Sequence, residues 1–190
     1  QQRIAAFIKT FQRLIWSSQR LSSLNKIALT GPVWLASDIH LGQSTVQTSE
    51  AFRDFLKLAS KEAAGLLLPG DIFDAWIGDD VAVVAPPWLA QDLMAIKACA
   101  AKIPVWLGRG NRDFLMGEAL AAGLGARLLP EQVLVTLNGR TLLLSHGDEY
   151  CTDDLPYQQF RAMVRNPAWQ SGFLARSIPE RLTLAAQARG

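Results

Sequence analysis

Hydrophobic and polar positions change along the chain in a regular order that predicts alternating strands and helices. Three short apolar runs, each followed by loop residues, are typical of buried parallel strands; they cover residues 33–36, 65–68 and 104–107. Apolar residues at helical spacing follow each run and predict helices over 49–64, 86–102 and 114–122. This order of strand, helix, strand, helix and strand predicts an α/β domain built on a parallel sheet.

The pattern changes after residue 128. Residues 132–137 and 141–145 are rich in leucine and β-branched side chains, and Asn138-Gly139 stands between them, which predicts a β-hairpin. From residue 155 onward the spacing is helical, with breaks at Pro167 and Pro179. We therefore expect a helical insertion from about residue 155, within one domain that begins at residue 31.

The first 30 residues form a separate predicted segment, a basic amphipathic N-terminal extension. Apolar residues over 1–26 make one stripe of a helix, with basic residues among their polar neighbours. The segment lacks the continuous apolar core and the cleavage site of a signal peptide. Two interpretations remain open: a helix docked on the domain or left from an upstream segment, or a helix lying on an anionic membrane surface.

Charge and cysteine content narrow the function classes. The formal net charge is +2, but five of the 19 basic residues precede the first acidic residue, Asp38, which leaves 14 basic against 17 acidic residues in the rest. The positive net charge therefore gives no argument for a nucleic-acid partner, and no feature points to an obligate protein partner.

The two cysteines, Cys99 and Cys151, are not spaced as a metal-binding pair, which favours free thiols in a reducing compartment. No apolar run reaches the roughly 18 residues of a membrane span.

Each of four predicted strands ends in a loop that carries a side chain able to bind a metal ion. We expect these loops to lie side by side at the carboxyl edge of the sheet, where open α/β sheets bind ligands. Both histidines of the chain belong to this set. The residues are Asp38, His40, Asp71, Asn111 and His146.

Carboxylate, imidazole and amide ligands suit Mn²⁺, Fe or Zn²⁺ in an octahedral-like site better than a thiolate-bound structural zinc. A site for two ions needs one bridging ligand, and Asp71, in the central loop, is the natural bridge. Two ions about 3.5–4 Å apart would activate water for in-line attack on phosphorus. The sequence therefore predicts a dimetal phosphohydrolase.

The same residues resemble a known family. Asp38-x-His40, Gly70-Asp71, Gly110-Asn111 and His146 resemble the motifs of the calcineurin-like metallophosphoesterases. The longer strings SDIHLG, GDIFDAWIGDD, GNRDFLMG and HGDEYCTDD, followed by YQQFRAMVRNP, resemble the UDP-2,3-diacylglucosamine diphosphatase family of lipid A biosynthesis. The resemblance runs from about residue 33 to the last residue.

This resemblance implies a four-layer αββα sandwich and two Mn²⁺ ions. It implies hydrolysis of the pyrophosphate of UDP-2,3-diacylglucosamine to UMP and 2,3-diacylglucosamine 1-phosphate. The implied location is cytoplasmic, peripheral on the inner face of the bacterial inner membrane. One ion would be held by Asp38, His40 and Asp71. The other would be held by Asp71, Asn111 and His146, which are also the implied catalytic residues.

The resemblance also assigns substrate contacts. Asn111, Arg112 and Asp154 match positions that contact the substrate, and a guanidinium such as that of Arg112 binds phosphate bidentately. Five aromatic residues could line a chamber for the acyl chains, although a plain core role is equally compatible with the sequence. They are Trp76, Phe114, Tyr157, Phe160 and Phe173.

Two departures from the family pattern leave alternatives open. The family begins at the first strand, so the extension is unexplained, and the Gly-His-x-His motif that ends the pattern is absent from residues 1–190. Each ion then lacks one histidine, and we expect an N-terminal portion of the domain, without its C-terminal strands, that is inactive as it stands. The alternatives are a metallophosphoesterase acting on another phosphodiester or nucleotide, and an inactive fragment or interaction protein.

Overall fold

The structure is a computed structural model that describes residues 23–187. Most of the segment interpreted as a basic amphipathic helix, residues 1–22, lies outside the described residues, as do residues 188–190. The two interpretations of that segment therefore stay predictions.

The first sheet contains four parallel strands in the order β2-β3-β4-β5. They are β2 (Val33–Leu35), β3 (Gly65–Leu68), β4 (Val105–Leu107) and β5 (Arg127–Leu128). Every residue of the central strand β3 is buried, as its uninterrupted apolar sequence predicts for a strand covered on both faces. Three predicted strands are thus confirmed in their predicted order, and β5 is a short addition at the edge.

Three helices cover one face of this sheet. They are α3 (Val46–Glu62), α4 (Pro87–Ala100) and α5 (Glu118–Leu124). Their inward residues, such as Phe52 and Ile96, pack with Leu66 and Leu68 of β3 in the larger hydrophobic core. The third helix begins four residues later than predicted, at Glu118, where the carboxylate of Asp79 accepts hydrogen bonds from backbone N–H groups at the helix start.

A second sheet, in the order β1-β6-β7, lies over the other face. The predicted hairpin is confirmed as β6 (Gln132–Leu137) and β7 (Arg140–Ser145), and Asn138 and Gly139 form the turn between them. Strand β1 (Asn25–Leu29) pairs in parallel with β6. The sequence pattern did not predict this strand, which lies in the stretch interpreted as an extension and forms one edge of the second sheet.

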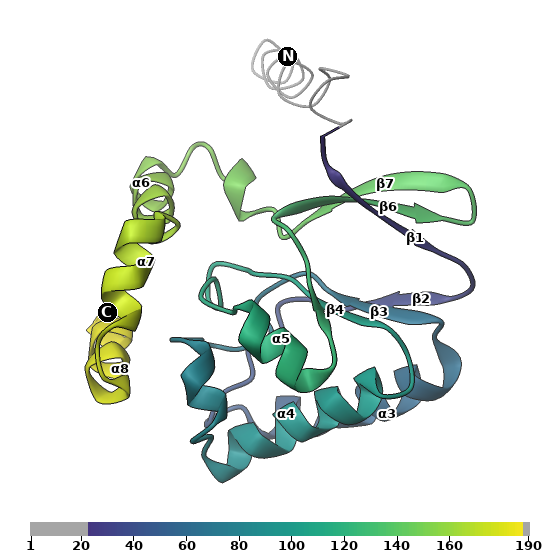
Figure 1. Ribbon diagram of the computed structural model, residues 1–190, viewed down its shortest axis with the longest axis horizontal. Helices are drawn as coiled ribbons and strands as arrows, with labels where there is room; N and C mark the ends of the chain where they lie inside the picture. Colours follow the sequence, from purple (N-terminus) through teal and green to yellow (C-terminus); the bar gives the residue numbers. More distant parts are fainter. Residues whose placement is uncertain (1–22, 188–190) are drawn as a thin grey trace.

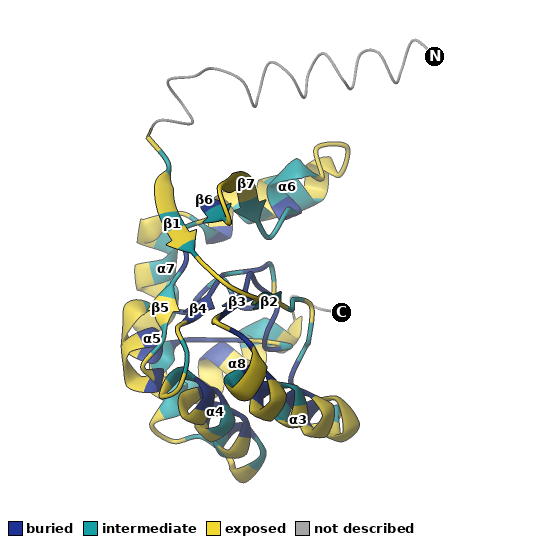
Figure 2. Ribbon diagram, turned by 90° about the vertical axis from the view of Figure 1, so that its right-hand side faces the viewer, coloured by how far each residue is buried: buried dark blue, intermediate teal, exposed yellow. Residues whose placement is uncertain are grey.

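Alternate side chains of the first sheet point into two separate cores. Leu67 and Trp106 face the second sheet, where they pack with Val133 and Val135 of β6. Figure 1 shows the resulting layers of helices, first sheet and second sheet. In Figure 2 the buried central strands lie between the second sheet and helices whose outer faces are exposed. These layers confirm the predicted α/β metallophosphoesterase sandwich, of which the described residues form three layers.

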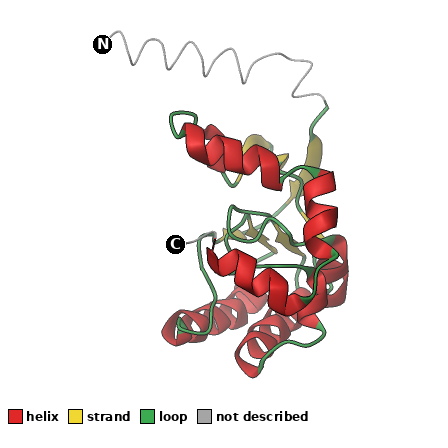
Figure 3. Cartoon of the chain, turned by 90° about the vertical axis from the view of Figure 1, so that its left-hand side faces the viewer, coloured by secondary structure: helices red, strands yellow, loops and turns green. Residues whose placement is uncertain are grey.

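The chain after β7 is helical, as predicted. A short 3-10 turn, η2 (Asp148–Tyr150), precedes α6 (Leu155–Val164), α7 (Pro167–Leu174) and α8 (Ile178–Gln187). Figures 1 and 3 show these three helices stacked along one side of the two sheets. The buried guanidinium of Arg181 in α8 pairs with Asp80 of η1 (Asp79–Ala82) and donates a 2.6 Å hydrogen bond to the Ile77 carbonyl. No described helix combines the length and apolar character needed to cross a bilayer.

Candidate functional site

The loops that follow β2 and β3 bring three predicted ligands together. One potential ligand atom each from Asp38, His40 and Asp71 lies within 4.8 Å of the other two. The backbones of the two loops are joined, because the N–H groups of Ile39 and His40 both donate to the Asp71 carbonyl, at 2.9 and 3.0 Å. The prediction that these three side chains lie close together at one sheet edge is confirmed.

All three of these residues have left-handed backbone conformations. Their φ angles are 56° at Asp38, 52° at His40 and 52° at Asp71. Such conformations cost about 1–3 kcal/mol each for residues other than glycine, and they cluster at functional sites. The two loops therefore have locally strained backbones, and this conformation directs the three predicted ligand side chains toward one point.

The Asp71 carboxylate lies between two histidines. Its Oδ2 is 3.8 Å from Nε2 of His40, and its Oδ1 is 3.8 Å from Nε2 of His146. Only 3% of the Asp71 side chain is exposed, against 38% for His40 and 9% for His146. A carboxylate with its two oxygens directed to different imidazoles has the geometry of a bridging ligand, which is the role predicted for Asp71.

Asn111 and His146, two further predicted ligands, also lie close together. The amide Oδ1 of Asn111 lies 3.2 Å from Nε2 of His146. Asn111 follows β4 of the first sheet, whereas His146 follows β7 of the second. The expectation that all four loops lie on one sheet edge is therefore wrong for His146, which reaches the same point from the opposing sheet.

Two glycines allow the loops to approach this closely. A Cβ on Gly70, whose φ is +137°, would lie 2.6 Å from the Gly110 nitrogen and 2.7 Å from Nδ1 of His146. A Cβ on Gly110 would collide with Oδ1 of Asp71 and lie 2.5 Å from the Asp71 nitrogen. Any side chain at either position would therefore separate Asp71 from its neighbours.

A buried carboxylate that sequence analysis did not select, Asp113, ties two of these loops together. Its Oδ1 accepts hydrogen bonds from the N–H groups of Gly110 (2.7 Å) and Asp71 (3.1 Å). Its Oδ2 accepts from Ile72 (2.7 Å) and Phe73 (3.3 Å). Burial, together with a smaller contribution from the charge of Asp71, raises the pKa of Asp113 to about 6 against the opposing effect of these hydrogen bonds. Asp113 was present in the GNRD string, but three of its four partners are about 40 residues away.

A second carboxylate, Asp148, joins the loop after His146 to α6. Its Oδ2 accepts hydrogen bonds from the Tyr157 hydroxyl (2.6 Å) and from Nε of Arg161 (2.8 Å). Burial acts to raise the pKa of Asp148, but these two hydrogen bonds and the charges of Arg161 and Arg165 together outweigh it and hold the pKa below its ordinary value. Tyr157 therefore fastens this loop, and it is not among the residues that line the cavity described next.

A cavity of about 740 Å³ opens beside the predicted ligands, between the loops that follow β3 and β4 and helices α6–α8. Four of the five predicted chamber residues line it: Trp76, Phe114, Phe160 and Phe173. Trp169, which sequence analysis missed, also lines the cavity and stacks on Phe173 at 5.1 Å between ring centroids. Its helical segment was predicted, but no local pattern showed that this side chain would face the other aromatic rings.

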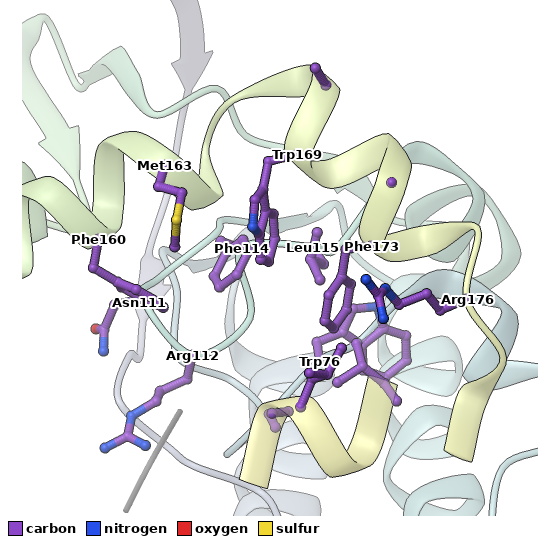
Figure 4. Close-up of a pocket in the computed structure, with 16 residues that line it drawn as sticks. Trp76, Asn111, Arg112, Phe114, Leu115, Phe160, Met163, Trp169, Phe173 and Arg176 are labelled. Atoms are coloured by element: carbon purple, nitrogen blue, oxygen red, sulfur yellow. The ribbon is translucent and has the colours of Figure 1, made fainter. Parts of the chain in front are cut away.

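Asn111 and Arg112 also line this cavity, at the end away from the aromatic cluster (Figure 4). The backbone N–H of Arg112 donates to Oδ1 of Asp71 at 2.8 Å, so the residue is fixed to the central ligand. Asp154, the third predicted substrate contact, caps α6 by accepting from the Tyr157 N–H at 3.0 Å, and it does not line the cavity.

Comparison with known proteins identifies the family. The sequence profile of the calcineurin-like phosphoesterases matches residues 31–179. The chain belongs to this family. Members of this family are metal-dependent hydrolases, as the predicted ligand set requires.

Curated relatives of this phosphoesterase are named UDP-2,3-diacylglucosamine hydrolases. A UDP-2,3-diacylglucosamine hydrolase from Bordetella pertussis is 66% identical over 88% of this chain and 65% of its own length. One from Chromobacterium violaceum is 46% identical over 80% of this chain and 63% of its own. The chain thus spans less than two thirds of the length of these relatives. Among solved structures, a nuclease from Pseudomonas putida aligns over 51% of this chain and 46% of its own at 26% identity, with a TM-score of 0.37.

The ligand set of this phosphoesterase fits the divalent metals that its family uses. Ligand atoms about 2.1 Å from one ion stand about 3–4 Å from each other. The Asn111–His146 and His146–Asp71 separations of 3.2 and 3.8 Å meet this requirement. Oxygen and imidazole donors without thiolate match the preferences of first-row divalent ions in open sites.

Proposed function

We propose that the site hydrolyses the pyrophosphate of UDP-2,3-diacylglucosamine, giving UMP and 2,3-diacylglucosamine 1-phosphate. The observation that carries this proposal is the position of Asn111 and Arg112. Asn111 is a predicted ligand and Arg112 is hydrogen-bonded to Asp71 through its backbone, and both residues also line the wall of the apolar cavity. A substrate with a charged diphosphate and two acyl chains needs a polar reaction centre that continues into an apolar chamber. The names of the relatives support the same substrate.

The proposed centre holds two Mn²⁺ ions that share Asp71. Asp38 and His40 would complete the ligands of the first ion, and Asn111 and His146 those of the second. Ions held by these residues would supply an activated water for attack on phosphorus and would offset charge on the phosphoryl oxygens. Support for the sharing comes from the two oxygens of Asp71, which are directed to different histidines.

The remaining residues bind and orient the substrate. No described residue accepts a hydrogen bond from the Arg112 guanidinium, which leaves its fork available for a phosphate. The aromatic residues of the cavity would bury the acyl chains, and burial of each methylene contributes about 0.8 kcal/mol. Asp154, on the exposed start of α6, would approach the sugar or its phosphate from outside the cavity.

We further propose that the protein works at the inner face of the bacterial inner membrane as a peripheral protein. The helices that bound the cavity carry exposed large apolar side chains, which could contact lipid while the substrate enters. These residues are Leu155, Phe160, Met163, Leu174 and Leu182.

Product analysis tests the proposed activity. The complete gene product, loaded with Mn²⁺, would be incubated separately with UDP-2,3-diacylglucosamine and with UDP-N-acetylglucosamine, and the products separated by mass. We expect UMP and the acylated sugar phosphate from the first substrate and little turnover of the second, because the second cannot use the cavity. Equal turnover of both substrates would instead support a phosphoesterase of soluble nucleotides.

A matched variant isolates the role of the cavity. Trp169→Ala removes the ring that stacks on Phe173 and leaves the ligand cluster intact. It should raise KM for the acylated substrate without changing the slow turnover of the soluble nucleotide. An unchanged KM would show that the acyl chains bind elsewhere.

A further inference from the structure

One arginine of the helical insertion reaches the loops that carry Asn111 and His146. Arg165 ends α6, and 13% of its side chain is exposed. Its Nη2 donates a 3.1 Å hydrogen bond to the carbonyl of Gly110, the residue before Asn111. The same Nη2 lies 3.6 Å from Oδ2 of Asp148, two residues after His146.

These two loops come from different sheets. The Gly110 loop follows β4 and the Asp148 loop follows β7, so no strand ladder fixes the distance between them. The separation of Asn111 Oδ1 and His146 Nε2, 3.2 Å, has to be set by contacts outside the sheets. Arg165 provides such a contact, because one guanidinium touches both loops.

The guanidinium is itself held in place. Its Nη1 lies 3.1 Å from Oε1 of Glu131, which precedes β6, and its carbon lies 5.7 Å from the centre of the Phe114 ring. Phe114 belongs to the cavity wall. Arg165 therefore connects the chamber with the second group of ligands, through a planar fork with several fixed acceptors.

We propose that Arg165 is a positioning residue that holds the Gly110–Asn111 loop and the His146–Asp148 loop at the spacing needed for Asn111 and His146 to bind one ion. The inference rests on the proposed two-metal centre and adds a residue to it from outside the sheets. It assigns the helical insertion a second role besides lining the cavity, since α6 then supports the metal site directly.

Arg165→Lys is the direct test, because lysine keeps the charge but its single ammonium cannot bond to Gly110, Glu131 and Asp148 together. The complete gene product would be stripped of metal and titrated with Mn²⁺ by calorimetry, and the dinuclear centre followed by electron paramagnetic resonance. We expect one of the two ions, the one proposed to bind Asn111 and His146, to lose about 10–100-fold in affinity, the usual effect of losing a group that orients metal ligands. Activity should fall at limiting Mn²⁺ and recover in excess Mn²⁺.

Arg53→Lys is the matched control. Arg53 is also a partly buried arginine, paired at 2.5 Å with the buried Asp92, but the pair lies between α3 and α4, away from the ligands. This variant should titrate with Mn²⁺ as the wild type does. Glu131→Gln provides a milder second variant. It removes the negative charge that faces Nη1 of Arg165, and because Glu131 is 48% exposed the change leaves no cavity in the core. It should weaken the same ion to a smaller extent.

The outcomes separate this inference from the proposed function. If the wild type binds two ions and Arg165→Lys and Glu131→Gln bind them with unchanged affinities, the inference is overturned and the proposed function still stands. Equal loss of both ions together with a lower melting temperature would also overturn it, because that result describes general destabilisation. A wild type that binds a single ion would refute the two-metal centre, and the inference with it.

Discussion

The carboxylate of Asp113 offers the sharpest stability prediction, because each of its oxygens accepts two backbone N–H groups. In Asp113→Asn one oxygen becomes an NH₂ group. Whichever way the amide turns, two buried N–H groups then face another donor. A buried donor without an acceptor costs about 1–3 kcal/mol, so the variant should lose about 2–6 kcal/mol of a total of about 5–15.

Thermal unfolding of the metal-free protein measures this loss. For a chain of this size about 1 kcal/mol lowers Tm by about 2–4 °C, so a loss of about 2–6 kcal/mol should make Asp113→Asn melt about 4–24 °C lower. The experiment belongs above the Asp113 pKa of about 6, where the wild-type group is ionised. Asp54→Asn, which alters an exposed carboxylate paired only with Lys57 among the described residues, is the control and should leave Tm unchanged. An Asp113→Asn protein with the same Tm as the wild type would refute the reasoning.

Three further predictions concern individual residues. Asp71→Asn should lower turnover by several orders of magnitude and weaken both ions, because a bridging charge is lost; elemental analysis that finds two tightly bound ions would contradict this. Arg112→Ala should keep the metal but lose much of kcat/KM, with Arg112→Lys rescuing only part of it, and an unchanged kcat/KM would exclude a substrate contact. Arg181→Met should raise KM for the acylated substrate without changing Mn²⁺ affinity, because Arg181 anchors α8 beside the cavity through Asp80 and the Ile77 carbonyl; a loss of Mn²⁺ would contradict it.

The strands and ligand loops of the first sheet could be predicted because their signal is local. Each is a short apolar run followed directly by a polar loop with a ligand, and parallel strands bring such loops to one edge. The hairpin was equally local, since Asn138-Gly139 determines the turn. Four of the five aromatic residues predicted as chamber candidates line the cavity, because they lie in or next to the ligand loops and the helical insertion that enclose it.

The features that were missed depend on contacts between distant parts of the chain. Strand β1 exists because it pairs with β6, more than 100 positions later, and its five residues continue an apolar spacing that looks helical. Arg165 meets Gly110 across 55 positions, and Asp113 meets Asp71 across 42. His146 could be predicted as a ligand, but its approach from the second sheet could not, because nothing local to β7 encodes which sheet it joins.

The most direct test of the account is a crystal structure of the complete gene product grown with Mn²⁺, with the ions located by anomalous scattering. The account predicts two peaks about 3.5–4 Å apart, with one carboxylate oxygen of Asp71 bound to each. His40 should lie on the first ion, and Asn111 and His146 on the second. A single peak, or two peaks of which Asp71 contacts only one, would contradict the proposed centre.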